Sequence, residues 1–347
     1  MKFVPLEKID ISRFLDLAEK IPVVDVRSPS EFNSGHIPGA FNIPLFDDSE
    51  RENVGIKYKK EGRSKAIITG IEITGPKMHL KLHEALKIAK DGKLLVHCWR
   101  GGMRSETMAW LFSLGDIDTE ILDRGYKAYR SYILTALSEK RKTIILGGMT
   151  GSSKTFILQN LKKQGQQIID LEGLANHKGS AFGALGQPLQ PSSEHFANLL
   201  FNEWKRKNND IPVWIEDESR NIGNVFIPDG FYNNLQDSPT IILLMEIKER
   251  IPRLMEEYST YPPELLKDSI MKISKRLGGD NTKDALHAVD KGDLAKAVEI
   301  VLKYYDKAYL YGIKRKNTKK LISIETVTDD VEVNANLVLN AAKNIVW

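Results

Sequence analysis

The sequence predicts an α/β protein with two domains, each built around a parallel sheet, and a basic helical extension on the second domain. Short apolar strands alternate with helical segments, which is typical of a parallel sheet covered by helices on both faces. The length of 347 residues suits two domains. A second strand, which runs into a glycine-rich loop, starts at Lys142. We therefore expect one domain at 1–137 and another at 138–347.

Local patterns predict the elements of the first domain. Apolar runs bounded by glycine, proline or serine indicate short strands, and apolar residues at helical spacing indicate helices. The segment 35–40 is rich in glycine and proline, so we expect a loop there. The expected elements are strands at 22–26 and 93–97 and helices at 30–33, 80–90, 105–114 and 128–141.

The same patterns predict the elements of the second domain. An apolar strand precedes the glycine-rich loop, and an amphipathic helix follows it. Helical spacing then continues through one long stretch before a final strand. The expected elements are strands at 142–146, 167–171, 213–216, 240–247 and 321–325, a helix at 155–163 and helices through 248–312.

Composition excludes several classes of protein. Hydrophobic residues make up 41% and charged residues 28%, a globular balance that excludes collagen, disordered tails and coiled coils. No apolar run approaches the ~18 residues needed to cross a bilayer, and charges interrupt the N-terminus, so we expect no signal peptide and no membrane partner. The single cysteine, Cys98, excludes an intramolecular disulfide and a cysteine-rich zinc site. We expect a soluble cytoplasmic protein.

Cys98 lies where a nucleophile is expected. The strand at 93–97 delivers it to a loop with two glycines, and the next helix begins near Ser105. Loop amides and a helix N-terminus favour a thiolate, and Arg100 and Arg104 add positive charge. A lone cysteine is usually a small buried hydrophobic residue, but packing does not require two arginines and two glycines within six residues. Cys98, Arg100 and Arg104 are therefore the candidate catalytic residues.

Two chemistries fit the cysteine loop. Cys98 and Arg104 have the Cys-x5-Arg spacing of cysteine-dependent phosphatases, with His97 before the cysteine and Ser105 after the arginine. The upstream segments 24–32 and 35–44 resemble the first-strand signature of rhodanese domains, which carry sulfur or selenium on cysteine. Some phosphatases share that fold, so the fold alone does not decide between the two reactions. The cysteine loop is one residue longer than in ordinary rhodaneses.

The segment 148–155 fits the phosphate-binding pattern G-x-x-x-x-G-K-[ST] at all but one position. Backbone amides would cradle a di- or triphosphate, Lys154 would pair with its oxygens, and Thr155 is a candidate Mg²⁺ ligand. Ser153 replaces the last glycine, and its side chain crowds the closest phosphate approach. A glycine-rich turn with an incidental lysine is the alternative. The candidate diphosphate-binding residues are Gly148, Gly151, Ser152, Ser153, Lys154 and Thr155.

An acidic cluster ends the expected strand at 213–216. Glu216, Asp217 and Glu218 follow one another there, and such acids commonly orient metal-bound water beside a phosphate loop. Alternation along the strand does not show which of the three points inward. Glu216 and Asp217 are the candidate acidic partners, and an exposed acidic strand end is the alternative.

Positive charge concentrates near the C-terminus. The net charge is +4, but residues 261–320 contain 14 basic and 8 acidic residues, with the densest basic run at 314–320. Such a cluster attracts phosphate backbones. Charge alone equally fits a solvated helix face.

Taken in order, five segments resemble the tRNA 2-selenouridine synthase family, which joins a rhodanese-like domain to a P-loop domain. The match covers most of the chain, and the longer cysteine loop is the form found in that family. The resemblance implies an N-terminal rhodanese-like domain and a C-terminal P-loop α/β domain with a basic helical extension at about 250–320. The segments are 97–105, 125–130, 148–155, 172–183 and 216–223.

The resemblance also implies an activity. Enzymes of this family convert wobble 2-thiouridine in tRNA to 2-selenouridine with selenophosphate, and they attach a geranyl group from geranyl diphosphate to the sulfur. The implied partners are tRNA, selenophosphate and geranyl diphosphate, with no tightly bound cofactor and Mg²⁺ as a candidate.

Under this interpretation each candidate residue has a role. The P-loop binds the diphosphate of the prenyl donor instead of binding ATP for hydrolysis, and Lys154 contacts that diphosphate. Cys98 acts in selenation, either as a selenium carrier or as the group that handles the displaced thiol. Arg100 and Arg104 hold selenophosphate or a nucleic-acid phosphate. The basic region at 261–320 contacts tRNA.

Two alternatives belong to other functional classes. A phosphatase–kinase fusion explains the cysteine and phosphate loops but not the segments 172–183 and 216–223, and it requires hydrolysis of aryl phosphates. A nucleotide-gated RNA-binding module predicts tRNA binding that survives Cys98→Ser, with no change to the tRNA.

Overall fold

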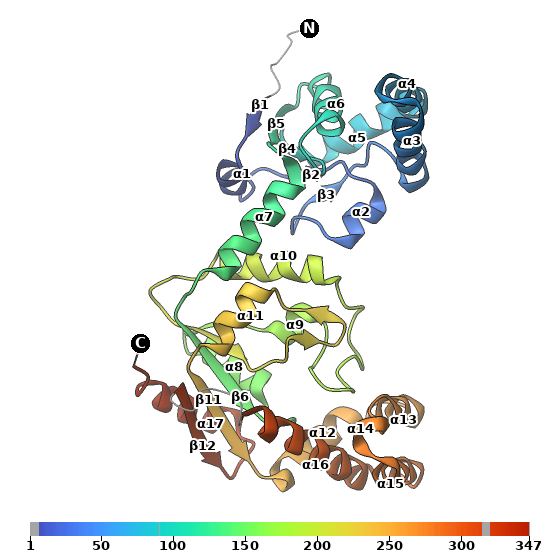
Figure 1. Ribbon diagram of the computed structural model, residues 1–347. Helices are drawn as coiled ribbons and strands as arrows, with labels where there is room; N and C mark the ends of the chain where they lie inside the picture. Colours follow the sequence, from blue (N-terminus) through green and yellow to red (C-terminus); the bar gives the residue numbers. More distant parts are fainter. Residues whose placement is uncertain (1–6, 90, 314–319, 347) are drawn as a thin grey trace. The chain divides into compact units, whose positions relative to one another are not determined.

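Two five-stranded parallel sheets form the centres of the two halves of the chain (Figure 1). The computed structural model describes residues 7–89, 91–313 and 320–346. The chain divides into two compact units, Met1–Ala136 and Leu137–Trp347. The expected boundary, between residues 137 and 138, lies one residue further along the chain. The predicted α/β class with parallel sheets is confirmed.

The first sheet has the strand order β1-β5-β4-β2-β3, and all neighbouring strands are parallel. The central strand β4 is buried from its second residue onward, as expected for a strand covered on both faces. Asp25 at the end of β2 pairs in register with His97 at the end of β4, so the Cys98 loop begins at the carboxyl edge of the sheet. The strands are β1 (Glu7–Ile9), β2 (Val23–Asp25), β3 (Phe41–Asn42), β4 (Lys93–His97) and β5 (Asp118–Leu122).

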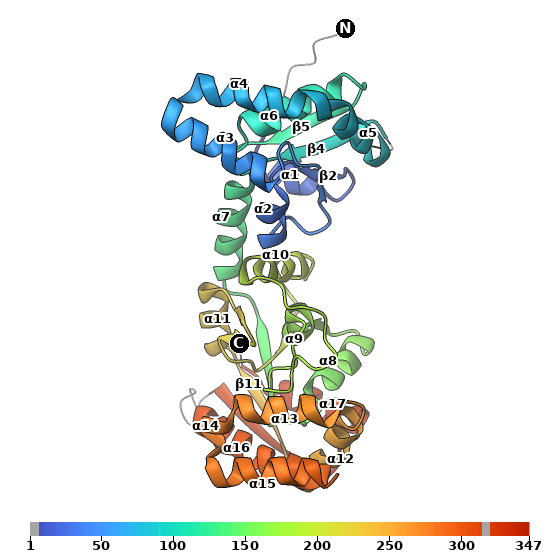
Figure 2. The same cartoon turned by 90° about the vertical axis from the view of Figure 1, so that its right-hand side faces the viewer.

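Helices α5 and α6 pack on this sheet through a cluster that includes Ala85, Val96 and Phe112. Two further helices, α3 and α4, were not predicted; they follow one another across Gly62 and pack together (Figure 2). The helices of the first unit are α1 (Ile11–Leu17), α2 (Pro29–Ser34), α3 (Asp48–Glu61), α4 (Arg63–Thr74), the 3₁₀ turn Gly75–Lys77, α5 (Met78–Ile88), α6 (Met103–Ser113) and α7 (Gly125–Ser138).

A buried ion pair connects the end of β2 to the loop after it. The Arg27 guanidinium donates through Nε and Nη2 to Asp25, at 2.9 and 2.6 Å, and also to the Gly35 carbonyl. It lies 3.8 Å from the ring centre of Tyr126. Burial raises the pKa of Asp25, but His97 and Arg27 lower it below its usual value. Because burial holds His97 neutral by lowering its pKa, Arg27 is the charged partner near neutral pH.

Replacing Arg27 with methionine is expected to lower the free energy of unfolding by about 3–5 kcal/mol, because it leaves the Asp25 carboxylate buried without a cation. Arg13→Met is the matched control, since Arg13 is half-exposed and pairs with Glu7 and Glu120 at the surface; it should cost under about 1 kcal/mol. Urea denaturation of the full chain measures both. Equal losses in the two variants would contradict the assigned role of the buried pair.

The second sheet has the order β12-β11-β6-β8-β7 and is again entirely parallel. Strand β6 lies between β11 and β8, with Gly148 opposite Leu243 and Leu146 opposite Glu216. The phosphate loop and the acidic strand end therefore share one edge of the sheet. The strands are β6 (Thr143–Gly148), β7 (Gln167–Ile169), β8 (Val213–Glu216), β11 (Thr240–Met245) and β12 (Leu321–Thr326), and β9 (Asn221–Ile222) and β10 (Val225–Phe226) form a separate antiparallel pair.

Helices α8 and α17 pack together on this sheet in a cluster that contains Leu158, Trp214 and Val338. Helices α10 and α11 meet through an edge-to-face contact of Trp204 with Phe231. The helices around the sheet are α8 (Lys154–Lys163), α9 (Leu171–Ala175), α10 (Ser193–Trp204), α11 (Asp229–Gln236) and α17 (Val331–Ala342).

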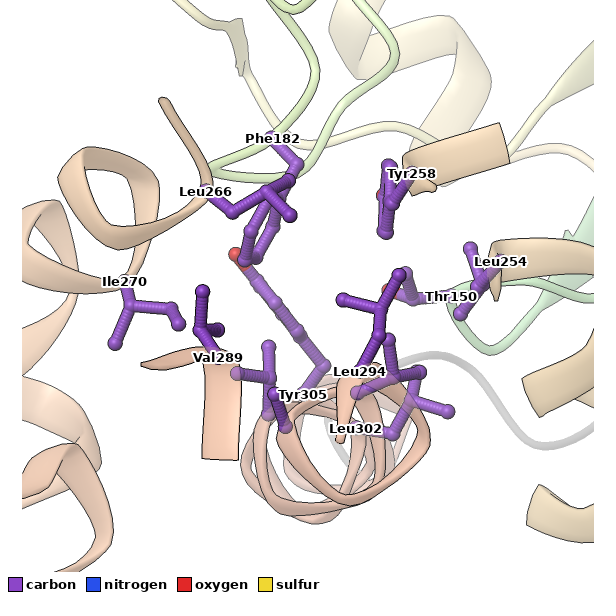
Figure 3. Close-up of a pocket in the computed structure, with 13 residues that line it drawn as sticks. Thr150, Phe182, Leu254, Tyr258, Leu266, Ile270, Val289, Leu294, Leu302 and Tyr305 are labelled. Carbon is purple, nitrogen blue, oxygen red and sulfur yellow. The ribbon is translucent and has the colours of Figure 1, made fainter. Parts of the chain in front are cut away.

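Five helices form the predicted extension (Figures 1 and 2). They share a hydrophobic core of their own. Their facing side chains leave a narrow apolar pocket (Figure 3). The part of the basic run at 314–319 lies outside the described residues. The helices are α12 (Ile247–Tyr258), α13 (Pro263–Lys272), α14 (Ser274–Leu277), α15 (Gly279–Asp290) and α16 (Leu294–Ile313).

Several predicted boundaries were displaced by two or three residues; the helix expected at 80–90, for example, is Met78–Ile88. Three of the displaced ends have a clear physical reason. The helix expected at 128–141 ends at Ser138, because the Asn234 amide caps the carbonyls of Ser138 and Glu139. The strand expected at 167–171 ends at Ile169, because the Asp170 side chain caps the start of α9. The strand expected at 240–247 ends at Met245, because α12 begins at Ile247.

Candidate active sites

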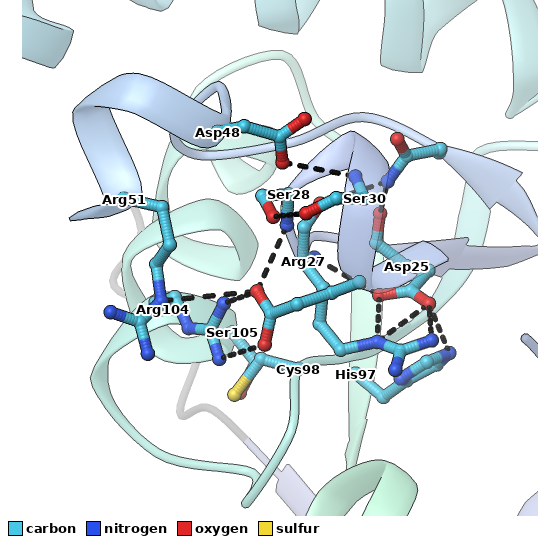
Figure 4. A network of polar contacts seen from close by, with 12 residues as sticks. Asp25, Arg27, Ser28, Ser30, Asp48, Arg51, His97, Cys98, Arg104 and Ser105 are labelled. Carbon is cyan, nitrogen blue, oxygen red and sulfur yellow. Dashed lines mark hydrogen bonds and ion pairs between the residues drawn. The ribbon is translucent and has the colours of Figure 1, made fainter. Parts of the chain in front are cut away.

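Cys98 begins the loop between β4 and α6 and lies near Ser105 and Arg104 (Figure 4). Two glycines, Gly101 in the loop and Gly125 at the start of α7, let the two segments pack together. Gly101 has φ +63°, and a Cβ there would lie 2.4 Å from the Leu122 carbonyl oxygen. Gly125 has φ +58°, and its Cβ would lie 2.3 Å from the Cys98 carbonyl oxygen. Neither position has room for a side chain, so the conformation of the loop depends on both glycines.

The first turn of α7 fixes the direction of the cysteine loop. The backbone N–H of Tyr126 donates to the Cys98 carbonyl at 2.8 Å, and that of Lys127 donates to the Trp99 carbonyl at 3.0 Å. With these carbonyls bound to α7, the backbone N–H groups of Arg100 and Gly102 are directed toward the sulfur. This contact gives a structural reason for the 125–130 segment, which the resemblance included without a role.

The surroundings of Cys98 favour its thiolate. Burial raises the pKa of the thiol, but the Ser105 hydroxyl, Arg104 and the loop amides together lower it below its usual value. The Ser105 oxygen lies 3.4 Å from Sγ and 2.9 Å from the Gly102 carbonyl, to which it donates. A hydroxyl has one hydrogen, so Ser105 donates to sulfur only when it releases Gly102. Sequence reasoning did not include Ser105 among the site residues.

The two candidate arginines differ in their surroundings. Arg104 donates to both carboxylate oxygens of Glu31, at 2.6 and 3.2 Å, whereas Arg100 is exposed. The positive charge of Arg104 is therefore partly neutralised, and Arg100 is the arginine open to an incoming anion. Glu31 was missed as a site residue, since nothing in the sequence links it to an arginine 73 positions later.

The phosphate loop has the predicted strand–loop–helix setting between β6 and α8. Gly151 has φ +84°, and Ser153 at the start of α8 has φ +61°. Ser153 therefore adopts the left-handed conformation that glycine favours at this position. The hydroxyls of Ser152 and Ser153 are buried without a hydrogen-bond partner. Such unpaired groups are rare in proteins, and phosphate oxygens would satisfy both.

Lys154 and Tyr309 both contact Gly148. The Lys154 ammonium donates to the Gly148 carbonyl at 3.1 Å. The Gly148 N–H donates to the Tyr309 hydroxyl at 2.8 Å, and this hydroxyl in turn donates to Asp217 at 3.2 Å. Tyr309 was missed because it belongs to α16, 161 positions after Gly148.

The structure resolves which acids point inward. Glu216 is fully buried and accepts a hydrogen bond from the Glu172 backbone at 2.8 Å, whereas Asp217 meets Tyr309. The Thr155 hydroxyl donates to the Glu172 carboxylate at 3.0 Å. Glu172 is therefore a further member of this cluster. The sequence placed it in the 172–183 segment but gave it no role.

Two carboxyls of this cluster, those of Glu216 and Glu218, have raised pKa values. Burial, with Asp170 and Glu172 nearby, raises the pKa of Glu216 well above its usual value. Burial and Glu172 raise the pKa of Glu218 to about 8, although Lys154 opposes the shift. Glu216 and Glu218 are thus largely protonated near neutral pH, which reduces their repulsion of a bound anion.

No three His, Cys, Asp or Glu side chains converge on a metal position in the parts of the chain that the structure describes. Mg²⁺ commonly keeps few protein ligands and takes its remaining ligands from substrate phosphates and water. Thr155 and Glu172 fit such a role, because their oxygens are the donor type that Mg²⁺ prefers and they lie together beside the loop.

The raised pKa of Glu218 predicts a pH-dependent stability. Unfolded glutamate titrates near pH 4.3, so between there and about pH 8 the folded chain binds more protons. The free energy of unfolding should therefore fall as pH rises through this window, by up to about 1.4 kcal/mol per unit. Glu218→Gln should flatten the dependence, and Glu256→Gln, at an exposed position, should not. Urea denaturation at pH 5.5, 7 and 9 measures this, and an unchanged slope in Glu218→Gln contradicts it.

Comparison with known proteins identifies the family. Residues 141–335 match the family described as the tRNA 2-selenouridine synthase AAA domain. The chain belongs to this family. Residues 11–132 match the rhodanese-like domain family. Both matches confirm the resemblance and the two domain types predicted from the sequence.

Relatives of the family align along most of the chain. The tRNA 2-selenouridine synthase of Nitrosomonas europaea is 33% identical over 85% of this chain and 90% of its own length. That of Shewanella frigidimarina is 33% identical over 87% and 91%. A crystal structure of the N-terminal domain of a putative ATP/GTP binding protein from Clostridium difficile 630 is 36% identical, covers 37% of this chain and 99% of its own, and has a TM-score of 0.35. Among the described residues, every helix is too short or too polar to cross a membrane.

Proposed function

We propose that this chain converts wobble 2-thiouridine in tRNA to 2-selenouridine, with S-geranyl-2-thiouridine as the intermediate. Membership of the family whose relatives are named tRNA 2-selenouridine synthase supports the overall reaction. Two steps are supported by the presence of two candidate anion sites in one chain. These are the cysteine loop, and the phosphate loop with its unpaired Ser152 and Ser153 hydroxyls. Geranyl diphosphate and selenophosphate are the anions proposed for them.

Geranylation is assigned to the phosphate loop. The thiocarbonyl sulfur of the nucleoside forms a bond to C1 of the geranyl group, the C1–O bond breaks, and pyrophosphate leaves with that electron pair while N3 loses its proton. Lys154 and the Ser152 and Ser153 hydroxyls stabilise the charge that develops on the leaving oxygens. When Mg²⁺ is bound at Thr155 and Glu172, it supplies further positive charge to the diphosphate.

Selenation is assigned to the cysteine loop. The selenium of selenophosphate forms a bond to C2, the C2–S bond breaks, geranylthiol leaves, and water then cleaves the phosphorus–selenium bond. Two roles for Cys98 fit the selenation step: a selenium carrier, or a group that handles the displaced thiol. A carrier needs an S–Se bond and therefore an oxidant, since selenium in selenophosphate is already reduced. Donation of the Cys98 proton to the departing sulfur needs no oxidant. We therefore assign Cys98 the role of proton donor to the displaced thiol.

Contact with tRNA is proposed for the basic extension. Several of its lysines are already paired within it: Lys267 contacts Glu264 and Asp290, and Lys296 and Lys303 contact Glu299. These pairs leave less free positive charge than the sequence count suggests. The proposed tRNA contact therefore depends more on the other basic residues of the extension than on Lys267, Lys296 and Lys303.

Mass spectrometry of digested nucleosides tests the proposed function. The full chain is incubated with 2-thiouridine tRNA, geranyl diphosphate and selenophosphate. An S-geranyl species should appear first and give way to 2-selenouridine, and omission of selenophosphate should stop the reaction at the geranylated nucleoside. Unchanged 2-thiouridine with intact tRNA binding would favour the RNA-binding module. Hydrolysis of an aryl phosphate without tRNA modification would favour the phosphatase–kinase fusion.

A further inference from the structure

An apolar slot opens inside the helical extension, beside the phosphate loop (Figure 3). Its enclosed free volume is about 20 Å³, close to the space that one water molecule needs, and the surface that faces it is almost all carbon. Thr150 of the phosphate loop forms part of the wall, together with Phe182 and side chains of α12, α13, α15 and α16. The slot therefore adjoins the loop to which the diphosphate is assigned.

Helix α12 connects the slot to the phosphate loop by one row of side chains. Arg250 donates to the Thr150 carbonyl at 2.9 Å and is held by two hydrogen bonds to Asp306. Leu254 and Tyr258 follow at intervals of four residues and line the slot. Residues four apart share a helix face, so this face runs from the loop backbone into the slot.

Helix α16 makes the same connection from the other side. Leu302 and Tyr305 line the slot, and Tyr309, one turn further, binds the Gly148 N–H. The phosphate loop and the slot are therefore held by the same two helices, each with a polar contact to the loop and apolar contacts to the slot.

The polar groups at the edge of the slot are already bonded. The Tyr305 hydroxyl accepts from the Ala181 N–H at 2.8 Å, and the Tyr258 hydroxyl is hydrogen-bonded to Ser180. A nucleoside base would leave its ring nitrogens and amino groups without partners here, which costs free energy. A hydrocarbon chain has no such groups and gains by leaving water.

On the basis of the proposed function, we propose that this slot binds the isoprenoid chain of the donor while the phosphate loop holds its diphosphate. The slot is narrow, so its walls must move apart to admit the chain. The loop then recognises an isoprenoid diphosphate rather than a nucleotide, and the length of the slot selects the length of the chain.

Ala297→Leu tests the proposal by filling the slot. Ala297 is buried on α16 and lines the slot. Ala288→Leu is the matched control, because Ala288 is buried in the same core but is not part of the lining. Binding of geranyl diphosphate, inorganic pyrophosphate and ATP to the full chain is measured by calorimetry, and circular dichroism verifies the fold.

The unmodified chain should bind geranyl diphosphate at least ~100-fold more tightly than pyrophosphate, since chain burial adds affinity. Ala297→Leu should reduce that ratio to about 3-fold or less and leave pyrophosphate affinity unchanged, while Ala288→Leu keeps the ratio. If Ala297→Leu fails to fold, Val301→Ala, which widens the slot, should raise affinity for farnesyl diphosphate relative to geranyl diphosphate.

The outcomes separate this inference from the proposed function. Equal affinity of the unmodified chain for geranyl diphosphate and pyrophosphate, tighter binding of ATP, or an unaltered ratio in Ala297→Leu would each overturn the slot assignment. Geranyl transfer in the tRNA assay would still support the proposed function in those cases. Absence of both geranyl diphosphate binding and geranyl transfer would overturn the two together.

Discussion

Cys98→Ser is expected to lower the rate of selenation at least ~1,000-fold and to leave geranylation within about twofold of normal. Serine keeps the size of the side chain but is a far weaker acid than a thiol, so it cannot supply the proton that the departing geranylthiolate needs. Proton transfer by a positioned group contributes typically ~10²–10⁴-fold. The two steps are measured separately, with 2-thiouridine tRNA plus geranyl diphosphate, and with tRNA that already carries S-geranyl-2-thiouridine plus selenophosphate.

The pH profile of selenation distinguishes the two roles of Cys98. A proton donor works as the thiol, so the rate should fall as pH rises through a cysteine pKa that the loop holds below its usual value. A thiolate carrier predicts the opposite slope. Ser113→Ala on α6 is the control, because Ser113 only donates to a backbone carbonyl within its own helix. A rate that rises with pH, or loss of both activities in Cys98→Ser, would contradict the assignment.

Strong local patterns predicted the elements that carry both sites. Strands β4 and β6 are buried apolar runs that end in glycine-bearing loops; β4 ends directly before Cys98, and β6, expected at 142–146, runs to Gly148. Helix α3 was missed because its sequence is polar and has no apolar face to mark it. Its signal was a capping box, Asp47 with Glu50, which marks a helix start.

Contacts between distant segments could not be predicted from local patterns. The inward direction of Glu216 depends on the register that places it opposite Leu146 of the neighbouring strand. The alternation of residues along one strand does not reveal its register with another strand. The pairing of Arg104 with Glu31 likewise joins α6 to α2. Ser153 was expected to crowd the phosphate loop, and its left-handed conformation shows how the backbone accommodates serine there.

Lys154→Ala is expected to reduce geranyl transfer ~100–1,000-fold and to leave selenation of pre-geranylated tRNA unchanged. The ammonium lies on the Gly148 carbonyl beside the unpaired hydroxyls of Ser152 and Ser153, where a diphosphate would gain negative charge as it leaves. Loss of one such preorganised donor typically costs ~10²–10³-fold in rate. Because Lys154 also lowers the pKa of Glu218, its loss should leave that carboxyl more firmly protonated.

Lys162→Ala is the matched control for Lys154→Ala, since Lys162 is exposed in the last turn of the same helix. It should retain geranyl transfer within about twofold. Lys154→Ala and Cys98→Ser should therefore have opposite defects. Lys154→Ala should fail to geranylate but still selenate tRNA that is already geranylated. Cys98→Ser should make the geranylated intermediate but fail to convert it to 2-selenouridine. Normal geranylation by Lys154→Ala with a loss of ATP binding would instead assign the phosphate loop to a nucleotide and remove the reason to divide the reaction between the two sites.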